Sequence, residues 1–587
     1  MTAWARRLAL VALLALAPRV AAAQSPEPSG NAPVVGTSPA LAHHDPTPTP
    51  TEPAPTATHT VTPTASHTAT ATPTLEPPSD PIALVIYGVV VGGSHPWLRA
   101  RVFPGFEPPL RRLYEPGELA PIWVRDGKPT AQALAMIAAF DTADERGLSR
   151  QDYDVQTLRD AAQRLADSST PSDEEVGLFD SALSISTLRY VSDAYVGRID
   201  PRRVDFPYDA PRRSFDPATV AREIADGAEP VARLAQLDPP FPQFAALRDA
   251  LGRYRALAAR KDLAAIPRLP KLRPGESDPG VPVLRAHLAA LGDLPADAPT
   301  PSGEHARVYD AALAQAVKHY QARNGLAADG VIGAGTLQAL QVPIADRVEQ
   351  IELAMERMRW LPYAWPHRFI VVNIPEFRLR AYNAGSGMPP LEMNVVVGEA
   401  ELAPNHETPV LMADMQYVVF RPYWMVPTSI FKKELAPKIA SDPSYLERNQ
   451  MEVHKGRIRQ KPGPKNSLGL VKFIFPNPHH VYLHDTPSKG LFARTRRDFS
   501  HGCIRVANPP ALAAYVLAET PGWDPERIAR AMSSGPDDRH VPLATPIPVY
   551  LLYNTAVADD AGQVHFFDDI YGHDASLQRQ LAKGYPY

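Results

Sequence analysis

The only cysteine of the chain stands in a short run that could carry nucleophilic chemistry: Ser500, His501, Gly502, Cys503, Ile504, Arg505, Val506. A thiol with its ordinary pKa of about 8.5 is mostly protonated at neutral pH, so an imidazole that accepts its proton converts it into a nucleophile. A second run, Tyr482, Leu483 and His484, supplies such an imidazole. These residues predict acyl transfer through Cys503, with His484 as the base.

The residues before Cys503 favour a reactive thiol over a passive one. A lone cysteine is also compatible with a buried apolar side chain that has no chemical role. However, His501 and Gly502 permit a tight turn, which can aim the Gly502 and Cys503 N–H groups at a developing oxyanion. His484 ends a strand-like run and can lie across a sheet from Cys503, because sequence separation does not limit strand pairing.

The segments that must position these side chains have the pattern of strands. Four short runs are rich in Val, Ile, Phe and Tyr and are separated by Gly, Pro or Asn: 369–373, 377–382, 393–397 and 415–420. Such runs are typical of a β sandwich or barrel. We place a mainly β catalytic domain at 367–553, an insertion with a helix-like stretch at 430–465, and a C-terminal extension packed on the catalytic domain at 554–587.

The chain before this β region is predicted to be helical. Apolar residues at helical spacing in 130–146 and 181–195 predict a helical scaffold domain over 81–265, in which the Val- and Ile-rich run 82–91 favours a strand. Residues 271–342 predict three short helices with apolar faces. The expected fold class is therefore multidomain α+β.

The N-terminus is typical of an export signal at 1–23. Arg6 and Arg7 precede ten apolar residues, and three alanines, 21–23, form a small-residue cleavage site, although an uncleaved anchor is the alternative. Residues 24–80 contain 13 Pro and 13 Thr, with no Lys or Arg, and predict a disordered linker. This linker is either a tether or an inert tail. Together the two segments predict an exported, soluble protein.

Composition and motifs argue against several other classes. With 60 Lys and Arg against 64 Asp and Glu, the net charge is -4, which leaves no global positive field to hold nucleic acid. The sequence contains no H-E-x-x-H run, and the histidines outside the two reactive runs lack metal-ligand spacing. We therefore expect no metal and no other cofactor. His479 and His480 are predicted to be exposed loop residues.

The two reactive runs together resemble the active-site signature of the L,D-transpeptidases, a histidine followed downstream by Ser/Thr-His-Gly-Cys-x-Asn/Arg. Residues 271–342 resemble the small peptidoglycan-binding domain of bacterial cell-wall enzymes, so the chain is similar to the long form of the family. Arg421 and Met425 depart from the pattern, which has Asn there. The resemblance extends to 373–375, Phe377, Gly398, 408–409, 422–424, 426–427, 459–469 and 569–571.

The resemblance implies a role for each site residue and a capping function for the insertion 430–465. Basic runs flank the signature, and their fixed cations would orient the carboxylates of a peptide substrate, with Arg505 favoured. The implied roles are nucleophile for Cys503, base for His484, oxyanion site and supporting turn for Gly502, Ser500, His501 and Tyr482, and substrate binding for Arg505, Trp424 and Tyr423.

The reaction implied by the resemblance is transfer at a peptidoglycan tetrapeptide stem in the periplasm. Cys503 would expel the terminal D-alanine, hold the stem as a thioester and pass it to an amine of another stem, forming 3-3 cross-links. Peptidoglycan stem peptides are the implied partners, with other cell-wall synthases as further candidates. The alternatives are a non-catalytic wall-binding protein, a cysteine L,D-carboxypeptidase that transfers to water, and a sortase-like or papain-like peptidase.

Overall fold

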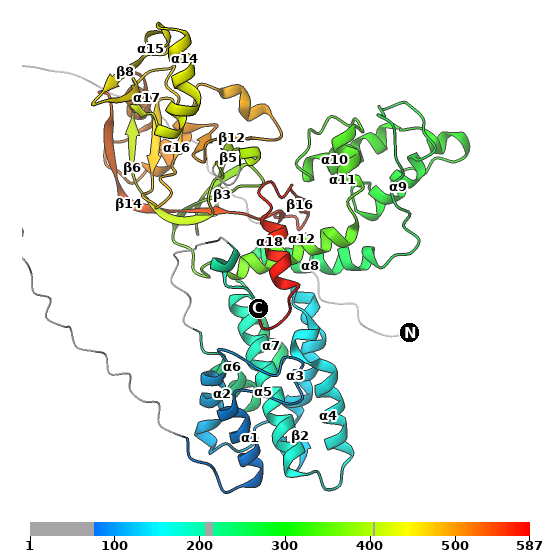
Figure 1. The fold of residues 1–587 in the computed structure, drawn as a ribbon. Helices are drawn as coiled ribbons and strands as arrows, with labels where there is room; N and C mark the ends of the chain where they lie inside the picture. Colours follow the sequence, from blue (N-terminus) through cyan, green and yellow to red (C-terminus); the bar gives the residue numbers. More distant parts are fainter. Residues whose placement is uncertain (1–74, 205, 207–214, 403–405) are drawn as a thin grey trace, which may run out of the picture. The chain divides into compact units, whose positions relative to one another are not determined.

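The structure is a computed structural model that describes residues 75–204, 206, 215–402 and 406–587. The predicted export signal at 1–23 and most of the linker at 24–80 lie outside the described residues. The described chain contains a helical region, a small helical module and a β catalytic region with an insertion (Figure 1). The predicted multidomain α+β fold is confirmed.

The N-terminal helical region is built around α5, Asp173–Val196, whose central residues are almost all buried. Ser172 caps this helix by accepting a hydrogen bond from the Glu175 N–H group, and three acidic residues in the first turn face the positive end of the helix dipole. The remaining elements are α1 (Pro81–Gly92), α2 (Glu107–Tyr114), β1 (Val124–Arg125), β2 (Lys128–Pro129), α3 (Ala131–Asp141), α4 (Val155–Asp167), α6 (Pro217–Ala225), α7 (Pro230–Ala235) and α8 (Pro242–Ala258).

The strand predicted at 82–91 is wrong, because this run forms α1. The Asp80 side chain accepts from the Ala83 N–H group at 2.8 Å, Pro81 occupies the first turn, and Gly93 closes the helix in the left-handed region at φ 60°. The buried residues of α1 follow a helical spacing and pack against α5. Capping and burial therefore outweigh the strand propensity of Val and Ile.

The small module contains the three predicted helices, α9 (Val281–Ala290), α10 (Ala311–Arg323) and α11 (Ala334–Leu340). Gly325 follows α10 at φ 65°, as expected for a glycine that ends a helix. Gln321 holds the turn before α11 by donating to Asp329 Oδ1 at 2.9 Å and to the Val331 carbonyl at 3.0 Å. A pocket of about 300 Å³ opens beside this turn.

Helix α12, Ile344–Arg359, follows the module and leads into the catalytic region. It packs on α8 and on the C-terminal helix α18, His573–Leu581. The Arg357 guanidinium contacts Asp574 of α18 at 2.5 Å, and the buried Glu356 carboxylate accepts from the Ile199 N–H group at 3.1 Å. These buried contacts join α12 to segments that are distant in sequence.

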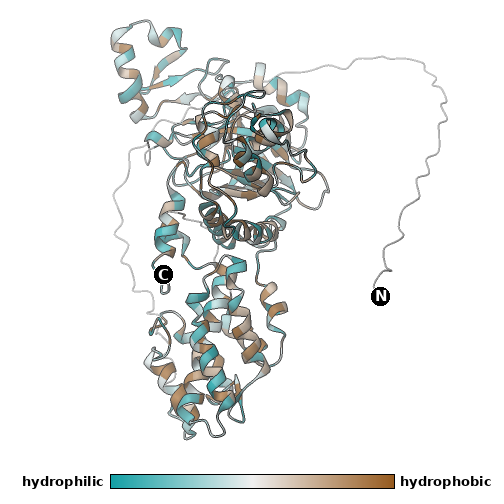
Figure 2. Ribbon diagram, turned by 90° about the vertical axis from the view of Figure 1, so that its right-hand side faces the viewer, coloured by the Kyte–Doolittle hydropathy of each residue, from teal (hydrophilic) through white to brown (hydrophobic). Residues whose placement is uncertain are grey.

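The catalytic region is a closed β-barrel. Its strands run in the order β5-β13-β11-β10-β6-β14-β3-β4, and a β4–β5 pairing closes the ring, while β12 pairs with β5. The four predicted runs are strands, and the barrel strands carry many of the hydrophobic residues drawn brown in Figure 2. The strand bounds are β3 (Arg368–Asn373), β4 (Arg378–Asn383), β5 (Leu391–Gly398), β6 (Leu411–Phe420), β10 (Val471–Ile474), β11 (Leu483–His484), β12 (Asp498–Ser500), β13 (Ile504–Val506) and β14 (Arg539–Leu552).

The insertion between β6 and β10 has its own small apolar cluster, formed around Val426, Leu435 and Met451. Its predicted helix-like stretch is present, with a π-helical turn, Phe431–Leu435, in the middle. The insertion elements are β7 (Trp424–Met425), α13 (Thr428–Ile430), α14 (Ala436–Ser441), α15 (Tyr445–Arg448), β8 (Met451–His454) and β9 (Arg457–Gln460). The chain after the signature adds α16 (Pro509–Val516), α17 (Pro525–Ser534), β15 (Ala556–Ala558) and β16 (Val564–Phe566).

Candidate active site

Two adjacent parallel strands bring the two reactive runs together. β11 and β13 pair with Leu483 opposite Ile504 and His484 opposite Arg505, and the Ile504 N–H group donates to the Tyr482 carbonyl at 3.0 Å. Leu483 and Ile504 are fully buried in the barrel core. Because side chains alternate along a strand, the four polar residues of these strands share the other face: Tyr482, His484, Cys503 and Arg505.

Tyr482 is a polar neighbour of Cys503. Burial raises the pKa of the Cys503 thiol, whereas the backbone N–H group and phenol hydroxyl of Tyr482 and the charges of Arg505 and Lys472 act in the opposite direction. The Cys503 thiol is therefore neutral at rest and surrounded by groups that would stabilise a thiolate.

His484 is held in its neutral form. Its Nδ1 atom lies 2.5 Å from the Asp485 carbonyl oxygen, and because a carbonyl can only accept, Nδ1 carries the proton and Nε2 keeps its lone pair. Burial and the charges of Arg505 and Lys472 lower the pKa of His484 to about 3. Cys503 is the diagonal neighbour of His484 across the two strands.

The turn before Cys503 is fixed by side-chain hydrogen bonds. Ser500 Oγ donates to the Cys503 carbonyl at 2.6 Å and accepts from the Gly502 N–H group at 3.2 Å. Gly502 has φ 104°, a conformation that favours glycine. In the resting structure the Gly502 N–H group, expected at the oxyanion site, is thus directed to Ser500.

A second set of contacts braces this turn from outside. Thr408 Oγ1 donates to the Gly502 carbonyl at 2.8 Å and accepts from the Gly398 N–H group at 2.9 Å. Tyr571 OH donates to the Gly398 carbonyl at 2.7 Å and accepts from the Thr408 N–H group at 3.2 Å. A Cβ atom on Gly398 would lie 1.8 Å from the His406 carbonyl, so only glycine fits there. The family resemblance included these residues, but sequence reasoning assigned them no role.

The insertion reaches the signature at His501. His501 Nε2 lies 2.6 Å from Glu434 Oε1 of the π-helical turn, and the His501 ring lies 4.4 Å from the His406 ring. His501 is thus an exposed contact point for the insertion rather than a buried support for the thiol. Nothing in the sequence pattern singles out Glu434 as its partner.

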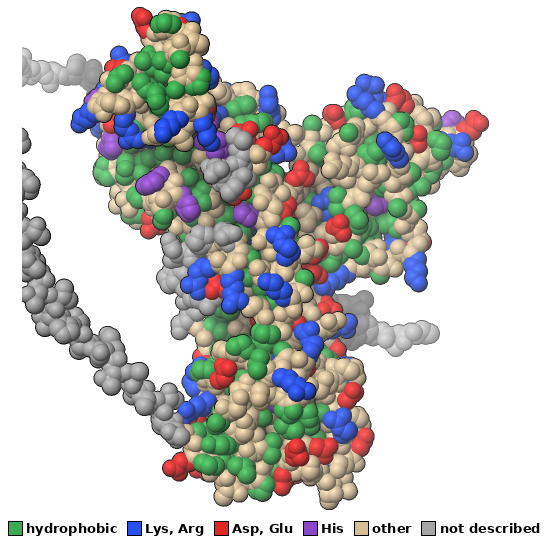
Figure 3. All heavy atoms as spheres, in the orientation of Figure 1, with side chains coloured by type: hydrophobic (Ala, Val, Ile, Leu, Met, Phe, Trp, Pro, Cys, Tyr) green, Lys and Arg blue, Asp and Glu red, His purple; other side chains and the backbone are tan. Residues whose placement is uncertain are grey.

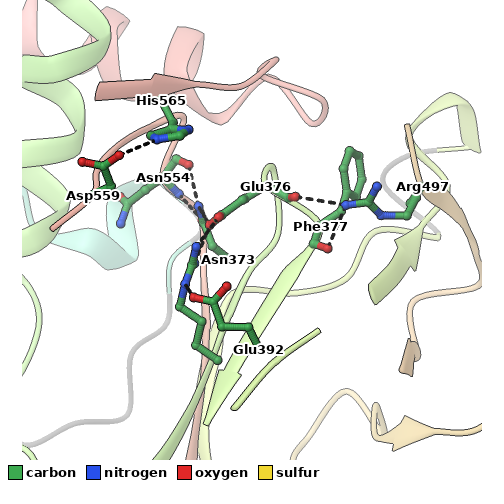
Figure 4. Close-up of polar contacts among 9 residues, drawn as sticks. Asn373, Glu376, Phe377, Glu392, Arg497, Asn554, Asp559 and His565 are labelled. Atoms are coloured by element: carbon green, nitrogen blue, oxygen red, sulfur yellow. Dashed lines mark hydrogen bonds and ion pairs between the residues drawn. The ribbon is translucent and has the colours of Figure 1, made fainter. Parts of the chain in front are cut away.

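Most of the basic residues beside the signature are engaged by the protein itself. Figure 3 shows Lys, Arg and His side chains gathered over the part of the chain where Figure 1 places the barrel and insertion. Arg497 donates to the carbonyls of Phe377 at 3.1 Å and Glu376 at 3.4 Å, next to the contacts of Asn373 with the Asn554 backbone (Figure 4). Arg496 pairs with Asp498 at 2.7 Å, and Lys489 with Asp485 at 2.5 Å.

Arg505 differs from these arginines. It lies on the Cys503 face, opposite His484, and its Nε atom is buried without a hydrogen-bond partner among the described residues. Burial lowers its pKa, and the nearby Cys503 acts against that shift. Arg505 is therefore placed beside the thiol with its charge available to a ligand.

The structure places Tyr423 and Trp424 in the insertion. The Tyr423 ring lies 4.0 Å from the Arg459 guanidinium, and Arg459 in turn pairs with Glu452 at 2.5 Å. Trp424 pairs with Gln460 in the insertion sheet and packs on its apolar cluster. Their contacts are those of residues that shape the insertion.

Lys472 is a candidate site residue that sequence reasoning missed. It lies on β10 directly opposite His484, and burial lowers its pKa. The alternation Val471, Lys472, Phe473 indicates that Lys472 points away from the core, but it does not show which strand lies beside it. Across residues 75–587, leaving out the undescribed gaps, no cluster of His, Cys, Asp and Glu could hold a metal ion. In the same residues no helix is long and apolar enough to cross a membrane.

A buried neutral histidine beside the only cysteine of the chain is the arrangement expected of a cysteine acyl-transfer site. Comparison with known families agrees with this class. Residues 367–531 match the family model described as "L,D-transpeptidase catalytic domain", residues 277–340 match "Putative peptidoglycan binding domain", and residues 108–251 match "Scaffold domain". The chain therefore combines a scaffold domain, a peptidoglycan-binding domain and an L,D-transpeptidase catalytic domain.

One curated relative is similar to this chain. It is named "Putative L,D-transpeptidase", comes from Haemophilus influenzae, and is 31% identical over 250 residues. The matched region covers 39% of this chain and 49% of the relative, so the chain spans about half the length of the relative.

Proposed function

We propose that this protein is a cysteine L,D-transpeptidase that forms 3-3 cross-links between peptidoglycan stems outside the cytoplasmic membrane. The observation that carries the proposal is the placement of Cys503, Tyr482 and His484 on one face of β11 and β13, within the region that matches the catalytic domain. The peptidoglycan-binding domain supports peptidoglycan as the partner.

In the first half-reaction, Cys503 Sγ attacks the carbonyl carbon of the third residue of a tetrapeptide stem. The thiol proton goes to Nε2 of His484, which is free because Nδ1 donates to the Asp485 carbonyl. The C–N bond to the terminal D-alanine breaks, and the imidazolium returns its proton to the leaving amine. An S–C bond has replaced the C–N bond, and the stem is held as a thioester.

The oxyanion of each tetrahedral intermediate needs hydrogen-bond donors. The Tyr482 hydroxyl acts on the sulfur and is therefore near enough to the reacting carbonyl to donate to the oxyanion. The Cys503 N–H group has no backbone acceptor among the described residues, whereas the Gly502 N–H group is directed to Ser500. We therefore assign the oxyanion to Tyr482 and the Cys503 N–H group, with Gly502 and Ser500 as support.

In the second half-reaction, an amine of another stem attacks the thioester carbonyl while His484 Nε2 accepts a proton from it. The C–S bond breaks, the proton returns to sulfur, and an amide links the two stems. Arg505 would orient the stem carboxylates, and Tyr423 and Trp424 of the insertion would cover the reacting groups. If water replaces the amine, the same residues give an L,D-carboxypeptidase.

A purified disaccharide-tetrapeptide distinguishes these functions. We expect free D-alanine together with a dimer whose mass is that of two tetrapeptide units minus one D-alanine, measured by liquid chromatography and mass spectrometry. The Cys503→Ala variant should form neither. Formation of tripeptide without dimer would favour the carboxypeptidase. An unchanged tetrapeptide, together with a folded protein that binds sacculi, would favour the non-catalytic wall protein.

A further inference from the structure

Lys472 forms a row with the two groups that flank the nucleophile. In the barrel, Lys472 lies directly opposite His484, and Arg505 lies opposite His484 on the other side. Directly opposite residues on neighbouring strands project from the same face of the sheet. The neutral base is thus enclosed between two cations, one on each neighbouring strand.

The Lys472 ammonium is aimed at the partner of the nucleophile. Its Nζ atom lies 5.9 Å from the centroid of the Tyr482 ring, a distance at which the ring face attracts a cation. Tyr482 neighbours Cys503, and its hydroxyl and N–H groups favour the thiolate form of the sulfur. The charge of Lys472 is therefore linked to the sulfur through one side chain.

Lys472 is also a cation without a close anion. It is half-buried, and no ion pair joins it to a carboxylate in the part of the chain that the structure describes. Asp538 is the carboxylate that influences it, and Asp538 itself lies 3.6 Å from His540. An unpaired, half-buried charge is costly unless another group uses it. A thiolate that forms at Cys503 is such a group.

We propose that Lys472 is a positioning residue for the Cys503 reaction, which holds the Tyr482 ring and offsets the negative charge that develops on the sulfur. This inference deepens the proposed function and rests on it. Because His484 is neutral, it supplies no charge until it has taken the proton. Lys472 and Arg505 supply positive charge before that step, so the thiolate is compensated as it forms.

The charged and titratable groups that face Cys503 come from several elements. His484 lies on β11 and Tyr482 directly precedes this strand, while Lys472 lies on β10 and Arg505 on β13. Farther out are the groups around the turn and at the start of β14: His406, Glu407, Glu434, His501, Asp538 and His540. Among these, Lys472 and Arg505 are the cations that lower the pKa of the thiol.

The test measures the pH dependence of Cys503 alkylation by iodoacetamide, followed by intact mass. The chain has one cysteine, so the modification reports on this thiol alone. For Lys472→Met we expect the midpoint of the curve of alkylation rate against pH to rise by about one pH unit. This shift lowers the alkylation rate at pH 7 by about tenfold. Lys472→Arg, which keeps the charge, should stay within about twofold of wild type. Lys583→Met removes an exposed lysine that contacts Gln580 and should leave the profile unchanged.

An unchanged midpoint in Lys472→Met would overturn the proposal, as would an equal shift in Lys472→Arg, which would indicate a role in packing only. If Lys472→Met does not fold by circular dichroism, Lys472→Gln is measured in its place with the same expected shift. Stem turnover is measured separately on the same proteins. A shifted midpoint in a protein that turns over no stems refutes the proposed function alone, whereas turnover with an unshifted midpoint refutes the role of Lys472.

Discussion

Glu434 Oε1 lies 2.6 Å from Nε2 of His501, so a residue of the insertion contacts the residue two positions before the nucleophile. Both side chains are partly exposed to solvent. The contact connects the π-helical turn of the insertion to the turn that presents Cys503. A displacement of the insertion would therefore break a contact with the turn that presents Cys503.

Removing this contact should loosen the insertion. Exposed ion pairs contribute about 0.2–1 kcal/mol, so Glu434→Ala should increase amide hydrogen exchange in 428–441 by up to about fivefold. Acylation by a small β-lactam should stay within about twofold of wild type, because it needs only the Cys503 site. Glu447→Ala, an exposed acidic residue of the same insertion, is the matched control. Unchanged exchange in Glu434→Ala would show that the apolar cluster alone holds the insertion.

The assignment of nucleophile and base predicts the behaviour of two variants toward a carbapenem. Wild type should gain one adduct mass per chain, and Cys503→Ala should gain none. His484→Ala should acylate at least about 10² more slowly, the usual size of a general-base contribution, with an unchanged circular dichroism spectrum. An adduct on Cys503→Ala would refute the assignment of the nucleophile, and near-normal acylation of His484→Ala would assign the base to another group.

The lowered pKa of His484 predicts an unusual pH profile. An ordinary imidazole with a pKa of about 6.5 would be half protonated at that pH and lose its function as a base below it. Because the pKa of His484 is lowered to about 3, acylation should stay nearly constant from pH 8 down to about pH 5. The rate constant of carbapenem acylation at each pH is the measurement. A fall in the acylation rate with a midpoint near pH 6.5 would mean that the His484 imidazole keeps the ordinary pKa of histidine.

The same pKa has a consequence for stability. Above pH 6.5 His484 is neutral in both the folded and the unfolded chain, so it contributes no pH dependence there. As the pH falls from 6.5 toward 3, the unfolded chain takes up a proton that the folded site refuses, so stability falls, by up to about 1.4 kcal/mol per pH unit. We expect the free energy of unfolding, measured with urea at pH 7 and pH 5, to change less between the two pH values in His484→Gln than in wild type.

Thr408 joins the end of β5 to the signature turn and gives a separate prediction. Thr408→Val keeps the shape but leaves the Gly398 N–H group and the Gly502 carbonyl without their partner. Lost buried hydrogen bonds of this kind cost about 1–3 kcal/mol, so the unfolding midpoint should fall. Acylation should fall by about tenfold because the nucleophile loses its fixed direction. Thr428→Val, at an exposed position, is the control.

The pocket of the small module predicts where this domain contacts the wall. Its rim carries two cations, Lys271 and Arg273, beside Asp329 and Thr336. The paired substitution Lys271→Ala and Arg273→Ala should reduce sedimentation with insoluble sacculi by severalfold, while acylation by a soluble β-lactam is spared. Lys318→Ala, which removes a cation of the same module outside this rim, should do neither. Equal sedimentation of all three proteins would place wall binding elsewhere.

The sequence predicts the strands well because runs such as 369–373 and 393–397 lie in a barrel whose core selects Val, Ile and Phe. It fails at 82–91, where Asp80 and Gly93 cap a helix that buries the same residue types. The signature identifies Cys503 and His484, but the register that brings Lys472 beside His484 depends on long-range pairing. No local pattern reports such a pairing.

The brace formed by Tyr571 also sets a dependence during folding. The thiol at 503, the imidazole at 484 and the barrel strands all precede residue 571, yet Tyr571 contacts both Gly398 and Thr408, and Thr408 holds the Gly502 carbonyl. A chain in which only the barrel has folded therefore has a thiol whose turn lacks this support. The support is complete only when the segment after β16 has folded back onto the barrel.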